Sequence, residues 1–309
     1  MKVLKPKFWE KKNSLLSLIL FPFAFFLQLL NKIRELFTSK ISFKIPIICV
    51  GNIYLGGTGK TPLSIFIAQE LLKYKKKPAV IKKYYPQHID EHELIKDKLG
   101  SLFLDRQRSK AIYKAENENY NVAILDDGFQ DHTIIKKFNI LCFNSIQLIG
   151  NGMTIPAGPL RESFNSLKKS NVVVINGNKN EIFEKKIYNI SKEIKIYYSR
   201  YIPMNINEFK NKKLFAFAGI GNPKNFFKLL VDNNLDVKSK IEFPDHYNYS
   251  KREIEKIKDI SVKNNWQIIT TEKDYFRIKK FGFENIKFLK IELEILEKDK
   301  FISQLLNAI

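Results

Sequence analysis

Cysteine is scarce in this chain of 309 residues, which has only two, Cys49 and Cys142. They are far apart in sequence, and each lies within an apolar run. A disulfide framework and a cysteine-rich metal site are therefore both excluded, and a reducing compartment fits best.

Acidic residues are also few, because 32 Asp and Glu stand against 53 Lys and Arg, and the formal net charge is +21. This surplus predicts attraction to an anionic partner such as a lipid, a nucleotide or a nucleic acid. A basic surface that merely follows from a lysine-rich composition is the alternative, so charge alone does not select the partner.

Long apolar runs are absent except at residues 15–30, LLSLILFPFAFFLQLL. A spanning helix usually needs about 20 apolar residues, and this run is shorter and contains Pro22. Lysines flank it on both sides, which favours a helix lying in an anionic membrane interface. A secretory signal peptide fits less well because no small-residue cleavage site follows. A buried core helix is the other alternative.

The remaining composition is that of a folded protein. Hydrophobic residues make up 44% of the chain and aromatic residues 13%, which excludes global disorder and fibrous repeats. At roughly 150 residues per domain, the length favours about two domains.

Short, continuous apolar runs alternate with segments of helical pattern. The first series lies at 45–50, 78–81, 121–126, 138–143 and 172–175, and the second at 213–219, 240–243, 266–270 and 286–291. Continuous apolar strands are typical of parallel sheets that are covered on both faces. The pattern predicts two α/β units.

The segment VGNIYLGGTGKTP at residues 50–62 follows a predicted strand and opens a predicted helix. Backbone N–H groups in such a loop bind phosphate oxygens at the helix N-terminus. The predicted ATP-binding residues are Gly56, Gly57, Thr58, Gly59, Lys60 and Thr61. In a P-loop, Lys60 reaches the β- and γ-phosphates and Thr61 ligates Mg²⁺. The strict pattern requires glycine at position 54, where this chain has Tyr54, and a glycine-rich turn without phosphate is the alternative.

The predicted fold is therefore α/β with three parts. Residues 1–40 form an N-terminal membrane-interface helical segment, and residues 41–180 a P-loop kinase-like domain with a parallel sheet. Residues 181–309 form a second, smaller α/β domain. The boundary is placed where NGNKNEIFEKK (176–186) interrupts the apolar pattern.

A P-loop needs an acidic partner at the end of a neighbouring strand, and NVAILDDGFQD (121–131) provides Asp126 and Asp127. We assign Asp126 to the metal and Asp127 to catalysis, facing substrate or lysine. A solvated turn is the alternative.

Five segments together resemble the tetraacyldisaccharide 4′-kinases, which phosphorylate the lipid A precursor. They are GNIYLGGTGKTP (51–62), LDDGFQ (125–130), GNGMTIPAGPLRES (150–163), FPDHYNY (243–249) and TTEKD (270–274). The resemblance extends over nearly the whole chain. It implies transfer of the ATP γ-phosphoryl group to the 4′-hydroxyl of a tetraacylated disaccharide 1-phosphate, at the cytoplasmic face of the bacterial inner membrane. It also implies an active site in the cleft between two domains.

The resemblance further implies an Asp-Glu pair and a histidine for the acceptor, here Asp90, Glu91 and His246. We predict Asp90 as the base, supported by His246, and Glu91 as a substrate-binding residue. The family usually carries Ser-Arg-Gly-Tyr-Gly before this pair, whereas this chain has KKYYPQHIDEHE (82–93). The match is therefore gapped, and a solvated charged turn is the alternative.

Arg161 and Glu162 match the PAGPLRE motif, which implies a cation near a substrate phosphate. A structural salt bridge is the alternative. Glu272, Lys273 and Asp274 match in residue type, without a physical reason to call them catalytic.

Two other function classes are considered. A membrane-associated partitioning ATPase also combines GGTGKT with a membrane helix, but its signature lysine would stand where this chain has Leu55. A nucleic-acid-binding module would show basic and aromatic clusters on one platform, and the lysines here are spread along the chain. The predicted partners are the lipid A disaccharide precursor and the anionic inner-membrane surface, without nucleic acid, and the oligomeric state is left open.

Overall fold

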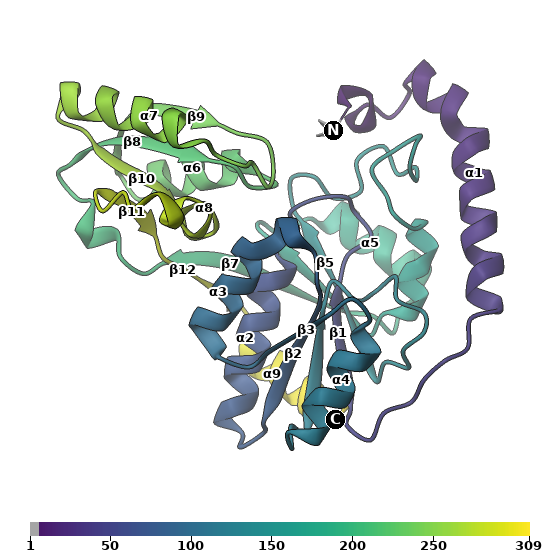
Figure 1. The fold of residues 1–309 in the computed structure, drawn as a ribbon. Coiled ribbons are helices and arrows are strands. Elements are labelled where there is room, and N and C mark those ends of the chain that lie inside the picture. The colour runs from purple at the N-terminus through teal and green to yellow at the C-terminus, as the bar shows by residue number, and fades with distance from the viewer. Residues whose placement is uncertain (1–5) are drawn as a thin grey trace.

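The computed structural model describes residues 6–309, which form two α/β units and a long apolar helix at the N-terminal side (Figure 1). The predicted α/β class is confirmed. The larger unit contains an eight-stranded sheet and the smaller unit a four-stranded sheet.

The eight-stranded sheet has the order β12-β7-β6-β5-β1-β4-β2-β3. Its strands are β1 Ile47–Gly51, β2 Pro78–Lys83, β3 Leu102–Asp105, β4 Val122–Asp126, β5 Phe138–Asn144, β6 Val172–Asn176, β7 Lys195–Pro203 and β12 Ile291–Ile295. Each neighbouring pair is parallel except β12 and β7, which are antiparallel. The strands β1, β4 and β6 are buried along their whole length, as continuous apolar runs predict for a sheet that is covered twice.

Helices cover both faces of this sheet. They are α2 Lys60–Lys73, α3 Ile89–Leu99, α4 Arg108–Asn117, α5 Glu181–Ile190 and α9 Lys298–Leu306. The apolar residues of α2, α3 and α9 pack into one core with one face of the sheet. Those of α4 and α5 pack into a second core on the other face. The carboxyl ends of the parallel strands stay uncovered by these helices, and parallel sheets build their sites there.

The smaller unit is a four-stranded parallel sheet of order β11-β10-β8-β9. Its elements are β8 Lys213–Ala218, α6 Pro223–Asp232, β9 Asp236–Glu242, α7 Lys251–Asn264, β10 Gln267–Thr271, α8 Glu272–Ile278 and β11 Ile286–Leu289.

Short 3-10 helices occur along the whole described chain, at Lys7–Glu10, Pro86–His88, Phe164–Lys169, Ile206–Glu208 and Lys279–Phe281.

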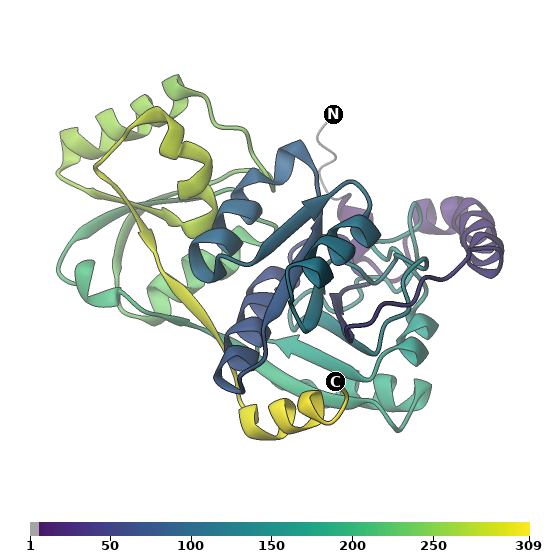
Figure 2. The same cartoon turned by 60° about the horizontal axis from the view of Figure 1, so that its bottom comes forward.

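The predicted domain boundary at residues 180/181 differs from the structure. Both α5 and β7 belong to the larger unit, and the chain returns to that unit in β12 and α9. The two units are therefore joined by the adjacent antiparallel strands β7 and β12 (Figures 1 and 2). The interruption at 176–186 comprises the end of β6, the loop that follows and the first turns of α5, all within the larger unit. Strand β12 is separated in sequence from the rest of its sheet. Apolar pattern alone does not reveal that return.

The apolar helix α1, Leu15–Leu36, continues six residues beyond the apolar run and is long and apolar enough to cross a membrane by length and composition. Only 11% of its most apolar window is buried, so the core-helix alternative is wrong. The exposed apolar side chains of this segment are Leu15, Leu16, Leu18, Ile19, Phe21, Phe23, Phe25, Phe26, Leu27, Leu29, Leu30, Ile33, Leu36 and Phe37.

One narrow face of α1 contacts Asn151 and Thr154 of the larger unit. The side-chain amide of Asn151 donates to Ser17 Oγ at 3.0 Å, and Gln28 Nε2 donates to Thr154 Oγ1 at 2.7 Å. The small buried residues Ser17 and Ala24 lie on this face. Near the end of α1, Glu35 also contacts Lys169 at 2.6 Å and His132 at 3.5 Å. Most of the remaining circumference is apolar and exposed, and Figure 1 shows the helix at the edge of the molecule.

Candidate active site

The predicted P-loop connects β1 to α2. Gly59 is the N-cap of α2 with φ of 95°, a left-handed conformation that glycine adopts without strain. The buried side chain of Asn52 closes the loop, because its amide donates to Tyr54 O at 2.6 Å and Thr58 Oγ1 at 2.9 Å. Tyr54, which replaces the glycine of the strict pattern, is buried in the core and paired with Leu160 by a backbone bridge. The tyrosine therefore packs away from the phosphate position.

The predicted metal residues Thr61 and Asp126 are in contact. The Thr61 hydroxyl donates to Asp126 Oδ2 at 2.9 Å. The other carboxylate oxygen of Asp126, Oδ1, is buried and has no hydrogen-bond partner among residues 6–309. Mg²⁺ prefers oxygen ligands and is commonly held by one carboxylate together with nucleotide phosphates. An orphaned carboxylate oxygen beside a P-loop threonine fits this ion.

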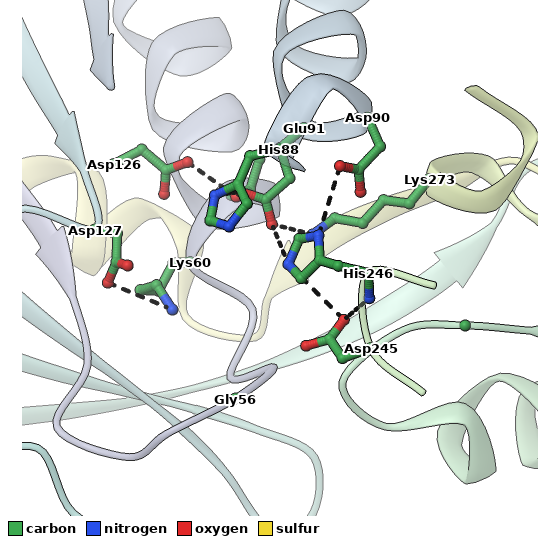
Figure 3. Close-up of polar contacts among 12 residues, drawn as sticks. Gly56, Lys60, His88, Asp90, Glu91, Asp126, Asp127, Asp245, His246 and Lys273 are labelled. Atoms are coloured by element: carbon green, nitrogen blue, oxygen red, sulfur yellow. Dashed lines mark hydrogen bonds and ion pairs between the residues drawn. The ribbon is translucent and has the colours of Figure 1, made fainter. Parts of the chain in front are cut away.

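Asp127 follows at the end of β4 with φ of 60° and turns toward the P-loop. Its carboxylate lies 3.6 Å from Lys60 Nζ (Figure 3). It also accepts from Arg161 Nη1 at 3.0 and 3.1 Å. Burial opposes ionisation, but the Lys60 and Arg161 cations hold the pKa of Asp127 well below its usual range. Asp127 thus stays ionised and orients both cations toward the cleft.

Lys82 lies between the P-loop side and the predicted acceptor side. Its ammonium contacts Asp126 Oδ2 at 2.5 Å and Glu91 Oε2 at 2.7 Å. Glu91 in turn contacts Lys273 Nζ of α8 at 2.5 Å. Although burial opposes ionisation, Lys273 and Lys82 lower the pKa of Glu91. The carboxylates of Asp126 and Glu91 likewise raise the pKa of Lys82. All three side chains are therefore charged at neutral pH.

Asp90 and His246 meet across the two units, as predicted. His246 Nδ1 lies 3.6 Å from Asp90 Oδ1, and Arg277 Nη2 of α8 contacts Asp90 Oδ2 at 2.5 Å (Figure 3 shows the Asp90–His246 pair). Although burial opposes it, His246 and Arg277 lower the pKa of Asp90 to about 2. The Asp90 side chain is 1% exposed and that of His246 25%. Of the pair, His246 faces the cleft, stacked on His88 at 4.5 Å between ring centroids.

A cavity of about 840 Å³ lies between the two units. Its lining includes the P-loop from Gly56 to Thr61, and Arg161, Glu91, His246 and Lys273. The smaller unit approaches the P-loop closely at Gly221, where a Cβ would lie 2.6 Å from Gly57 N. The residues predicted to bind phosphate and those predicted for the acceptor, except Asp90 and Glu162, thus line the same cleft.

The sequence comparisons agree with this geometry. Residues 16–309 match the model of the tetraacyldisaccharide-1-P 4′-kinase family. A tetraacyldisaccharide 4′-kinase from Pelagibacter ubique is 44% identical over 314 residues, covering 99% of this chain and 98% of the relative. One from Rickettsia akari is 31% identical over 316 residues, covering 96% and 95%.

The chain belongs to the tetraacyldisaccharide 4′-kinase family. The predicted resemblance is confirmed. The crystal structure of LpxK from Aquifex aeolicus in complex with ATP has a TM-score of 0.74 and 23% identity, covering 95% of this chain and 99% of that one. At this identity the likeness shows the shared fold.

Three predicted site residues do not line the cavity: Asp90, Asp126 and Glu162. Asp90 and Asp126 contact the lining residues His246 and Lys82, respectively. Glu162 is half-buried and does not line the cavity, and burial raises its pKa. Its neighbour Arg161 donates to Asp127 instead and lines the cavity. A substrate-binding role for Glu162 stays a prediction without geometric support.

Sequence reasoning missed three charged or aromatic side chains of the site in this 4′-kinase family member: Lys82, His88 and Arg277. The sequence does contain a signal for Lys82, because this residue stands near the carboxyl end of an apolar strand. Asp126 is predicted as a site residue from the same position at the end of its own strand. Arg277 lies one helical turn after Asp274, to which it donates at 2.8 Å. No local pattern marks Arg277 or His88 as neighbours of Asp90 and His246.

Proposed function

We propose that this protein transfers the γ-phosphoryl group of ATP to the 4′-hydroxyl of tetraacyldisaccharide 1-phosphate, a step of lipid A biosynthesis. In this reaction the 4′-oxygen bonds to the γ-phosphorus, the bond from the γ-phosphorus to the bridging oxygen breaks, and ADP leaves. The hydroxyl proton passes to a base. The observation that carries the proposal is the placement of Lys60 and the Asp90–His246 pair on opposite walls of one cleft.

On the nucleotide wall, the P-loop N–H groups and Lys60 bind the phosphates. Phosphoryl transfer needs mainly alignment and stabilisation of charge, and preorganised cations supply both. Thr61 Oγ1 and the free Oδ1 of Asp126 would hold Mg²⁺, which neutralises phosphate charge when it is bound. Asp127 keeps Lys60 and Arg161 directed at the cleft by its two ion pairs.

On the acceptor wall, Asp90 and His246 act as one unit. Because His246 is the exposed member, the 4′-hydroxyl meets its imidazole first, and Asp90 stabilises the imidazolium that forms when the proton is taken. This proposal exchanges the two roles expected from the sequence, in which Asp90 is the base and His246 its support. A carboxylate with a pKa near 2 is a weak base by itself, which agrees with a supporting charge at Asp90. Arg277 holds Asp90 in position through its 2.5 Å contact.

The acceptor is a lipid, and α1 is suited to deliver the protein to it. The exposed apolar circumference of α1, with basic residues on both sides, fits the interface of an anionic membrane. We place the protein at the cytoplasmic face of the inner membrane, where ATP is available. The hydrogen bonds from α1 to Asn151 and Thr154 attach the membrane helix to the same segment, 150–163, that contains Arg161.

The test is transfer of labelled γ-phosphate from ATP to tetraacyldisaccharide 1-phosphate in mixed micelles, with thin-layer separation of the lipid product. We expect labelled lipid from the wild-type protein and none from the same acceptor with its 4′-hydroxyl blocked. Hydrolysis of ATP at the same rate with and without acceptor, and no labelled lipid, would refute the proposal. That outcome would favour an ATPase of the partitioning type.

A further inference from the structure

Lys82 occupies a position that the proposed mechanism has not yet used. It is the register partner of Asp126, directly opposite on the neighbouring strand, so the sheet itself sets the pair in contact. The Lys82 side chain is 5% exposed, and its ammonium lies 2.5 Å from Asp126 and 2.7 Å from Glu91. A buried lysine with two carboxylate partners has a fixed position, because moving it would leave buried charges unpaired.

These contacts form a continuous chain of alternating charge across the cleft. It runs from Asp126 to Lys82, then to Glu91, and ends at Lys273 in the smaller unit. Asp127 has its own partners in Lys60 and Arg161. Each carboxylate at the phosphate side of the cleft is thus already paired with a cation before any nucleotide binds.

We propose that Lys82 is a positioning residue that holds Asp126 and Glu91 in place and keeps the affinity of the nucleotide-free site for Mg²⁺ low. Mg²⁺ then enters together with ATP rather than ahead of it. This inference rests on the proposed role of Asp126 as a metal ligand.

The physical reason is the position of the ammonium relative to the free ligand atom. Lys82 contacts Oδ2 of Asp126, whereas Oδ1 of the same carboxylate is the oxygen without a partner. A metal ion at Oδ1 would share one carboxylate with a fixed positive charge, and repulsion between them is strong in a buried site. The phosphates of ATP add several negative charges, and their attraction for the metal ion outweighs its repulsion by Lys82.

The first measurement uses calorimetry to determine the affinity of the full-length, nucleotide-free protein for Mg²⁺. Mn²⁺, a paramagnetic ion, serves as a second probe of the same site. In Lys82→Met, which keeps the length of the side chain without its charge, we expect the affinity for either ion to rise at least tenfold. Lys82→Arg keeps the charge and should keep the weak binding. Lys83→Met is the matched control, because this adjacent lysine does not line the cleft.

The second measurement is turnover at saturating Mg²⁺. Without Lys82, Asp126 and Glu91 repel each other and lose their fixed geometry, so we expect kcat to fall at least tenfold in Lys82→Met. Tighter metal binding with slower turnover is a combination that general loss of structure does not produce. Unchanged or weaker metal affinity in folded Lys82→Met would overturn the inference.

In Lys82→Met, Asp126 loses its cation and Glu91 keeps only Lys273 of its two lysine partners, and this variant could fail to fold. The double variant Lys82→Met/Glu91→Gln removes one carboxylate together with the lysine. It must show the same tightened Mg²⁺ binding, because Asp126 has again lost its cation. Weak binding in the folded double variant would also overturn the inference.

Asp126→Asn separates this inference from the proposed metal site. A non-hydrolysable ATP analogue is titrated at several Mg²⁺ concentrations. Asp126→Asn should raise the Mg²⁺ concentration at which the analogue binds tightly. If it does so while Lys82→Met has no effect, the inference alone is wrong. If Asp126→Asn changes nothing, the metal role of Asp126 is wrong, and the inference falls with it.

Discussion

The two walls of the cleft are built in different ways. The phosphate wall consists of one loop and the ends of adjacent buried strands, and hydrogen bonds within the larger unit close it. The acceptor wall combines Asp90 and Glu91 of α3 with His246, Lys273 and Arg277 of the smaller unit. The first wall depends on local sequence and one sheet, whereas the second depends on how two units meet.

This difference has a functional consequence. Apart from Gly221, which packs against Gly57, the smaller unit should tolerate changes without loss of nucleotide binding, because Lys60, Thr61 and Asp126 keep their partners within the larger one. Acceptor chemistry should respond to changes in either unit. Substitutions in each wall therefore test whether the two are as independent as their construction indicates.

The largest effect is expected from Lys60→Ala on the phosphate wall. Loss of this preorganised charge should reduce kcat by roughly 10³ or more. Lys60 contributes little packing, so the melting temperature should change little. Lys185→Ala, an exposed lysine on α5, is the control and should keep full activity. Lipid phosphorylation at wild-type rate by Lys60→Ala would remove the P-loop assignment.

On the acceptor wall, Asp90→Ala and His246→Ala should each lower kcat by roughly 10²–10³, with the KM for ATP nearly unchanged. Since the two act as a unit, the double variant should be only slightly slower than the slower single variant. Steady-state kinetics with both substrates measures this. Multiplicative losses would show that the two residues act separately, and a raised KM for ATP would show that the walls are not independent.

A smaller effect is expected from charge on the exposed face of α1. Phe23→Asp combined with Phe26→Asp should weaken binding to anionic vesicles and raise the apparent KM for lipid about tenfold, without changing that for ATP. Both side chains are more than half exposed, and the contacts of Ser17 and Gln28 stay intact. Vesicle sedimentation measures attachment. Undiminished sedimentation would show that another surface binds the membrane.

The smallest effect concerns stability in acid. The pKa of Asp90 is lowered to about 2 in the folded protein, so its stabilisation is present above about pH 4 and is lost as pH falls through about 2. The full contribution is roughly 2 kcal/mol. Urea unfolding between pH 3 and 6 measures the free energy of unfolding. In the wild type this free energy should fall as the pH is lowered, and it should fall less in Asp90→Asn. Equal decreases would mean that Asp90 titrates normally.

Much of the phosphate wall could be predicted from sequence because its parts are contiguous. A strand, a glycine-rich turn and a helix follow one another within residues 47–73, so the P-loop needs no long-range contact to be recognised. Asp126 was found because its strand is a continuous apolar run that ends in carboxylates. The acceptor wall could be named only through the family resemblance, since its residues share no local pattern.

The α/β class, the P-loop, the apolar helix and the excess of positive charge can be predicted from the sequence, because each depends on composition or on residues close together in the chain. The return of β12 to the larger sheet and the pairing of Lys82 with Asp126 and Glu91 become visible in the folded chain alone. The folded chain also shows that Arg277 supports Asp90 while Glu162 lies apart from the cleft. These outcomes depend on strand register and on the packing of two units, which bring together charges far apart in sequence.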